Sequence, residues 1–414
     1  MIIECKIALL VFLMLICLIY SPVSLLLLII VLSIFLKGSE KYIGVLIGLF
    51  LGLISMTIEF NNYYPDVVRY YSQYNNDIND ALYKMKFYRY IVFSIINYFN
   101  FNANVYSFIS ICTIVIIQFK TALNYLEVCN KNIDSIKNKL LLIVVCISSL
   151  PLTMYLSFEN VLAFSVVSYG ISVHLKKKYL VSYTIFIMAC FIHVAAILPV
   201  AFIYIAQFAT KGKWKKYVSI ISYVLCLMFL LYVMNHKVIT GITDIDQIFD
   251  KVFRYNSNAW AHLTRTEKLY NLPYVFLMFT LFSLAIRSVK DKNVVIVKYF
   301  FSFYIIFILF FITNRMVIVR YGLLMPIFFS PLLMLYLCSV KDSLINKTVI
   351  FTFFIVCFLS IPNVYIMKKI GNELTFNKKS PFFNTLLDIY NYNTSIPNLS
   401  ELEKNKMSTL KERS

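Results

Sequence analysis

Long apolar runs, separated by short polar stretches, recur along most of this 414-residue chain. A helix needs about 20 apolar residues to cross a bilayer, and several of the runs approach or exceed that length. The pattern predicts an all-α, polytopic integral membrane protein with about 12–13 transmembrane helices, some of them short or re-entrant. The predicted membrane segments are Ile7–Leu36, Tyr42–Phe60, Val105–Leu123, Leu140–Ser157, Val161–His174, Tyr179–Thr210, Tyr217–Met234, Leu272–Ile286, Val294–Thr313, Tyr321–Cys338 and Thr348–Ile366.

The path of the chain is ambiguous in two places. The run Ile7–Leu36 fits either one tilted span or two short helices hinged at Ser21-Pro22. The segment Tyr83–Phe101 is aromatic and amphipathic and has lysine and arginine near its start, which is typical of an interfacial or re-entrant helix.

Charge supports the membrane assignment and gives it an orientation. Apolar residues make up 60% of the chain and charged residues 14%, and the formal net charge is +19. Lysine and arginine are scattered in short loops, as the positive-inside rule describes for cytoplasmic loops, so we expect no nucleic-acid partner. We predict one transmembrane domain over residues 1–367, with outer loops at 61–86 and 235–271. A polar, weakly ordered tail follows at 368–414, and we place it on the outer side.

The run Tyr179–Thr210 is flanked by lysine clusters at both ends. One straight span would place one of these clusters outside. Two short helices that meet near His193 would keep both clusters inside, as the charge rule favours. We therefore predict a helical hairpin with His193 at its outer apex.

Several classes of catalytic site lack their usual motifs in this sequence. The nine cysteines include no CxxC pair, and with nine glycines there is no glycine-rich phosphate loop. No HExxH or DxD motif is present. We therefore expect no metal and no cofactor.

The stretch "YYPDVVRYYSQYNN" places Asp66, Arg69, Tyr70 and Tyr71 directly after an apolar run. Tyrosine is enriched at membrane interfaces, so an aromatic belt with a local Asp66–Arg69 pair is one interpretation. In the other, the tyrosines stack on sugar faces while Asp66 and Arg69 bind hydroxyl or phosphate groups.

His193, in "FIHVAAILP", is either a satisfied polar residue at a helix end or a proton-transferring group. A third group is "NRMVIVRYG", in which Arg315, Arg320 and Tyr321 occur on the predicted outer side. Arginines are less expected there, and their planar guanidinium groups suit phosphate recognition, although ordinary flanking cations are the alternative.

Three further residues are weaker candidates. Glu159, in the predicted turn "SFENVLAF", could act as a base, but a residue at the start of a helix more often caps it. Arg254 and Arg265, in the long outer loop, could bind substrate or could simply be solvated.

Together the three motifs, "D..RYY..Y", "H.AAI" and "NR…VRY", resemble in order and spacing those of the EpsG branch of Wzy-type polysaccharide polymerases. The resemblance extends over residues 40–385. It implicates Asp66, Arg69 and Tyr70 in the first motif, His193 in the second, and Arg315, Arg320 and Tyr321 in the third. His193, Asp66 and Arg320 are the expected catalytic residues, and the others are expected to bind substrate. The sequence departs from the family at Glu159-Asn160, close to where relatives often carry an arginine.

The resemblance also implies a substrate and a location. Family members join repeat units carried on undecaprenyl diphosphate, at the outer face of the bacterial cytoplasmic membrane. Membrane lipid and a chain-length regulator protein would be further partners. Arginines would stabilise the departing diphosphate, and His193, in preference to Asp66, would accept the proton of the acceptor hydroxyl. The sequence leaves two alternatives, a flippase of lipid-linked sugars and a transferase that adds a single sugar from a polyprenyl phosphate.

Overall fold

The architecture is that of a computed structural model, which describes residues 20–60, 66–76, 78–83, 86–131, 135–149, 157–242, 245–246, 249–250, 252–253, 262–263, 265–289, 294–339, 348, 374–376 and 384–390. Helices dominate, and the predicted all-α, polytopic membrane protein is confirmed. Among the described residues, four helices are long and apolar enough to cross a membrane, and five further apolar helices are shorter. The last predicted span, Thr348–Ile366, lies almost entirely outside the described residues.

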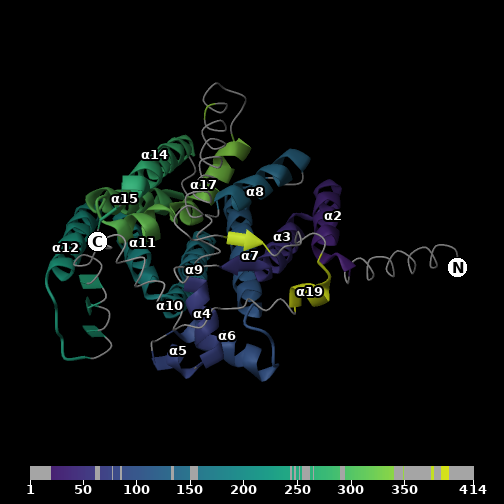
Figure 1. The fold of residues 1–414 in the computed structure, drawn as a ribbon. Coiled ribbons are helices and arrows are strands. Elements are labelled where there is room, and N and C mark those ends of the chain that lie inside the picture. The colour runs from purple at the N-terminus through teal and green to yellow at the C-terminus, as the bar shows by residue number, and fades with distance from the viewer. Residues whose placement is uncertain are drawn as a thin grey trace.

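The first half of the described chain consists of α2 (Pro22–Phe35), α3 (Glu40–Met56), β1 (Ile58–Phe60), α4 (Asp66–Asn76), α5 (Asn79–Tyr83), α6 (Phe87–Tyr98), α7 (Val105–Val128), α8 (Ile136–Ser149) and α9 (Phe158–Leu175). The second half consists of α10 (Tyr179–Ile192), η2 (Val194–Ala196), α11 (Ile197–Ala209), α12 (Lys213–Asn235), α14 (Arg265–Ser288), α15 (Val295–Phe310), α16 (Arg315–Val317), η4 (Ile318–Gly322), α17 (Met325–Ser339), β2 (Leu374–Phe376) and α19 (Leu386–Tyr390). Figure 1 shows α4, α5 and α6 grouped at one end of the bundle.

Helix α9 lies in the middle of the bundle and is buried on nearly all sides. It packs against α7, α10 and α17, and its serines bond to neighbouring helices. Gln118 of α7 donates to Ser165 at 2.9 Å, and Asn124 of α7 donates to Ser172 at 2.9 Å. Small residues and interhelical hydrogen bonds are a common way of joining helices in membranes. Helix α9 is therefore the axis around which the other elements are placed.

Glycines spaced four residues apart let α3 lie close to α7. A Cβ atom at Gly44 would fall 2.5 Å from Phe119, and one at Gly52 would fall 2.9 Å from Phe108. Gly48, between them, faces the Cys112 carbonyl of α7 at 3.0 Å from such a Cβ. A stripe of glycines of this kind allows two helix backbones to approach closely.

The predicted hairpin around His193 is present. Helix α10 ends at Ile192, His193 has extended backbone angles, and η2 and α11 follow. The two helices fold back on each other, since the rings of Tyr183 and Tyr204 stack at 5.7 Å and Gln207 donates to the Tyr183 hydroxyl at 3.1 Å. Figure 1 shows α10 and α11 close together.

Three helix boundaries differ from, or sharpen, the sequence-based expectation. Helix α9 begins at Phe158, so Glu159 and Asn160 lie in its first turn and not in a connecting turn. The segment from Arg315 is already helical, whereas we predicted a loop up to Arg320. Helix α2 begins at Pro22, where proline is favoured in a first turn. Residues 7–19, on which the choice between one and two helices in the first run depends, lie outside the described residues.

We name the two ends of the bundle by their chemistry. At the lysine-rich end, where α7 and α9 finish, Lys176 and Glu127 form a 2.6 Å ion pair. At the opposite end, which we call the site end, α7 and α9 begin and α10 reaches His193.

Two segments of the predicted weakly ordered tail have defined places at the site end. Strand β2 pairs antiparallel with β1, with Glu59 opposite Thr375. Asn102 donates to the carbonyl of Tyr390 in α19 at 2.7 Å. Both segments therefore lie at the end that we predict to face outside.

The first prediction concerns the sides of the membrane on which the two ends lie. In a background whose native cysteines are replaced, cysteine at exposed Tyr98 or Thr313 should react with a membrane-impermeant thiol reagent in intact cells. Cysteine at exposed Lys177 or Trp214 should react only after permeabilisation. Labelling of position 313 only in permeabilised cells would contradict this topology.

Candidate functional site

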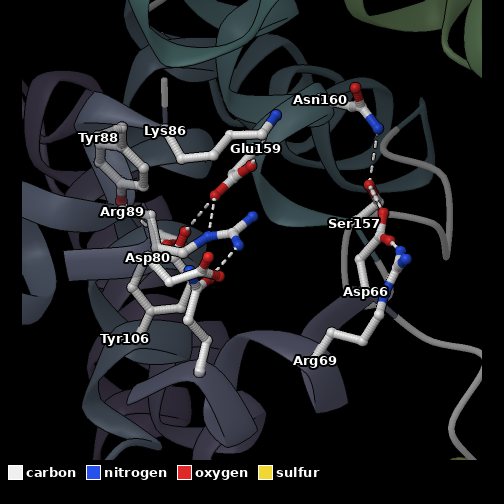
Figure 2. A network of polar contacts seen from close by, with 12 residues as sticks. Asp66, Arg69, Asp80, Lys86, Tyr88, Arg89, Tyr106, Ser157, Glu159 and Asn160 are labelled. Atoms are coloured by element: carbon white, nitrogen blue, oxygen red, sulfur yellow. Dashed lines mark hydrogen bonds and ion pairs between the residues drawn. The ribbon is translucent and has the colours of Figure 1, made fainter. Parts of the chain in front are cut away.

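The carboxylate of Glu159 is at the centre of the site end, and its side chain is 2% exposed. Arg89 Nε donates to Glu159 Oε1 at 2.7 Å, and the Tyr106 hydroxyl donates to the same oxygen at 3.2 Å. Lys86 Nζ lies 3.7 Å from Glu159 Oε2. Figure 2 shows these side chains converging on Glu159 from different elements. Because burying a charge costs free energy unless opposite charges and hydrogen bonds compensate it, these partners stabilise the buried Glu159 carboxylate.

Arg89 is held by contacts on several sides. Besides binding Glu159, its guanidinium donates to Gln73 Oε1 and lies over the ring of Tyr70, 4.0 Å from the ring centre. Gln73 in turn donates to Asp80 Oδ2 at 2.8 Å. A cation above an aromatic face is stabilised by the ring quadrupole, so α4 and α6 are joined through this one side chain.

Lys86 is a half-buried ammonium group with charged side chains around it. Burial lowers the pKa of Lys86, the Glu159 carboxylate opposes this shift, and the positive charges of Arg89 and Arg320 add to it. Arg320 of the third motif is therefore near enough to Lys86 for their charges to interact. Lys86 and Arg89 contact Glu159 directly, and a group of cations of this kind is suited to an anionic ligand.

A second polar chain begins at Asp66, the first residue of α4. Asp66 is ion-paired with Arg69 one helical turn later. Ser157, directly before α9, donates to Asp66 Oδ2 at 2.8 Å, and Asn160 Nδ2 donates to Ser157 Oγ at 2.7 Å. Figure 2 shows this chain beside the Glu159 cluster. The cations Lys86 and Arg89 and the carboxylate of Asp66 therefore both lie near the start of α9.

His193 performs a local structural task at the apex of the hairpin. Its Nδ1 accepts a hydrogen bond from the Ala195 backbone N–H at 3.1 Å and so caps η2. A neutral imidazole that accepts at Nδ1 carries its proton on Nε2. In this arrangement His193 can donate a hydrogen bond through Nε2, but it has no free nitrogen lone pair with which to take a proton.

The third motif forms a π-helical turn, η4, in which Leu323 N–H donates to the Ile318 carbonyl at 2.9 Å. Single π-turns often occur at functional sites. The turn contains Arg320 and Tyr321, and the Tyr321 hydroxyl donates to the Ala195 carbonyl at 3.2 Å. The Tyr321 ring also lies 5.5 Å from that of Phe164 in α9. The second and third motifs are therefore in direct contact.

The structure brings most of the predicted site residues to the site end, but not all of them. Arg315 is half-buried at the start of α16, and Asn314 before it caps that turn and pairs with His262 of the long loop. Arg265 is exposed at the start of α14. Arg254 lies outside the described residues.

The expectation that the tyrosines of the first motif offer their faces to sugars does not fit their burial. Tyr71 is 2% exposed, and its hydroxyl is bonded to Ser107. Tyr70 is also buried and packs edge-on against Tyr106 at 5.8 Å. Burial raises the pKa of both hydroxyls. These two rings form the wall of the site, not its open surface.

Sequence reasoning missed the cationic partners of Glu159. Lys86 and Arg89 were assigned to the polar edge of an interfacial helix, because cations near membrane interfaces usually are solvated. Their spacing of three residues, which puts both on one face of a helix, was the available signal. Ser157 and Gln73 gave no signal at all. Within the described residues, no group of three or more His, Cys, Asp or Glu side chains is arranged to hold a metal ion.

The second prediction tests the buried charge cluster. Glu159→Gln leaves Lys86 and Arg89 without their buried counter-charge, so it should destabilise the protein by about 3–5 kcal/mol. Glu127→Gln removes the carboxylate of the ion pair with Lys176, in which the Glu127 side chain is 72% exposed, and should cost at most about 1 kcal/mol. Thermal unfolding of the two variants in detergent compares them directly. Equal melting temperatures would contradict the central role of Glu159.

Comparison with known proteins does not add to this description. No family model, no curated protein and no solved structure matches the chain. A function must therefore be argued from the residues of the site end and from the three sequence motifs.

Proposed function

We propose that the protein is a polymerase that joins oligosaccharide repeat units carried on undecaprenyl diphosphate. The observation that supports this most is the pairing of two cations at Glu159, Lys86 and Arg89, with a carboxylate chain (Asp66, Ser157 and Asn160) at the start of α9. Arg320 interacts electrostatically with Lys86. The cationic group suits a diphosphate, and the carboxylate chain suits a hydroxyl. The resemblance of the three motifs to EpsG-like polymerases points to the same substrates.

In the proposed reaction, the oxygen of an acceptor hydroxyl attacks the anomeric carbon of the sugar attached to the diphosphate. A glycosidic C–O bond forms while the bond between the anomeric carbon and the phosphate oxygen breaks. The electrons of the broken bond leave with the diphosphate, and the hydroxyl proton passes to a base. Lys86 and Arg320 stabilise the negative charge that grows on the diphosphate.

We propose Asp66 as this base, which reverses the preference for His193 stated above. The His193 Nδ1 lone pair is used to cap η2, so taking a proton there would break the turn. A carboxylate that activates a hydroxyl nucleophile has a parallel in inverting glycosidases. His193 then holds the η2 turn against Tyr321 and can donate a hydrogen bond through Nε2.

The location of the charged side chains at one end of the bundle favours a transferase over a flippase. Transporters usually place their substrate groups near the bilayer midplane, between repeated halves. Here the charged groups of the site lie where α7 and α9 begin, at the site end. We place this end at the outer face of the bacterial cytoplasmic membrane, where the lipid-linked units would be joined.

The third prediction tests the activity itself. Deletion of the gene should remove the ladder of long surface polysaccharide on a gel, while material with a single repeat unit is retained and the intact gene restores the ladder. A normal ladder would reject a polymerase. Loss of single units together with the ladder would indicate a flippase or a transferase that adds one sugar.

The fourth prediction separates the roles of Asp66 and His193. Asp66→Asn keeps the shape but not the basicity, so it should abolish the ladder when membrane levels of the protein are normal. His193→Asn keeps a side-chain acceptor that can cap a helical turn, so it should retain most of the ladder. An active Asp66→Asn together with an inactive His193→Asn would return the base to His193.

A further inference from the structure

A buried polar atom of Asn160, at the start of α9, has no hydrogen-bond partner among the described residues. The Asn160 side chain is 6% exposed, and its Nδ2 donates to Ser157 Oγ at 2.7 Å. The Oδ1 atom of the same amide is buried and accepts no hydrogen bond within the described part of the chain. Buried polar atoms are rarely left in this state, because the unmade bond costs free energy.

The hydrogen-bond network determines which way this amide points. Asp66 is ion-paired with Arg69, so its carboxylate can only accept hydrogen bonds. Ser157 has one hydroxyl proton and gives it to Asp66 Oδ2 at 2.8 Å. Ser157 Oγ can therefore only accept from Asn160, which must present its Nδ2. Oδ1 is directed away from Ser157, as Figure 2 shows.

An unmatched oxygen in this position indicates a ligand that donates a hydrogen bond. An apolar side chain of the same shape would avoid the cost of the unmade bond. The ligand is unlike a phosphate, because an amide oxygen repels anions and Asp66 and Glu159 lie on either side of the same helix start. A neutral hydroxyl group fits both requirements.

We infer that Asn160 Oδ1 accepts a hydrogen bond from a sugar hydroxyl and so forms a glycan subsite at the start of α9. This inference rests on the proposed function, in which the acceptor glycan approaches Asp66. A carboxamide is not a base, so Asn160 binds and orients the hydroxyl while Asp66 takes the proton. The subsite separates the two substrates, with the glycan at the Asp66 chain and the diphosphate at the cationic group.

The chain offers a matched control for testing this residue. Asn124 in α7 also donates from its amide to a serine of α9, Ser172, at 2.9 Å, but towards the lysine-rich end. Leucine at either position removes a buried amide and one hydrogen bond to serine. Asn160 and Asn124 therefore share the amide-to-serine hydrogen bond but differ in their position relative to the site.

The test measures glycan binding without any chemical step. Full-length protein in detergent is melted with and without the oligosaccharide released by mild acid from the host strain's own lipid-linked repeat unit. The wild type and Asn124→Leu should show the same upward shift of the melting temperature with the oligosaccharide. Asn160→Leu should lose that shift, although without oligosaccharide it should melt no lower than Asn124→Leu.

Two results would overturn the inference. One is a full shift in Asn160→Leu, which would mean that Oδ1 holds only water. The other is the absence of a shift in the wild type, which would mean that no glycan binds there. If leucine at position 160 prevents folding, Asn160→Ala gives the same comparison without added bulk. The gel ladder of the deletion strain tests the polymerase separately, so failure of the subsite and failure of the proposed function are distinguishable.

Discussion

A carboxylate as deeply buried as that of Glu159 is stable only where opposite charges and hydrogen-bond donors surround it. The surrounding groups come from the start of α6 and from α7, with Arg89 70 residues and Tyr106 53 residues before Glu159 in the chain. Bringing Arg89 to Glu159 also brings Gln73 and the Tyr70 ring of α4 with it. The buried charge of Glu159 therefore determines how α4, α6 and α7 meet α9 at the site end.

Contacts made by helix α9 connect the Glu159 cluster to the rest of the site. Its start is held by Asp66 through Ser157, and further along Phe164 packs against Tyr321 of the π-turn. Tyr321 then contacts the η2 turn that His193 caps. Motifs that are distant in sequence thus become neighbours because each contacts α9 or an element packed on it. A site built in this way can separate an anion from a hydroxyl by a few residues of one helix.

Local signals in the sequence predicted much of the fold. Apolar length gave the helices, and the two lysine clusters predicted the break at His193, because each depends on residues close together in the chain. The Glu159–Arg89 pair joins positions 70 residues apart, and no local pattern distinguishes a buried arginine from an interfacial one. The capping bond at His193 Nδ1, which motivates the proposed change of base, also lay beyond the sequence, since it depends on the backbone of the turn. Residue types indicated the site, whereas its internal pairing required the structure.

We propose that the cations at Glu159 bind the diphosphate, which leaves as the glycosidic bond forms. Purified protein in lipid vesicles, supplied with lipid-linked repeat units, allows free undecaprenyl diphosphate and new glycosidic bonds to be counted together. We expect one undecaprenyl diphosphate to be released for each glycosidic bond formed. We expect both products to be lost in the double variant Lys86→Met/Arg320→Lys when that protein still folds. Bond formation without release of the diphosphate, or undiminished activity of that variant, would contradict it.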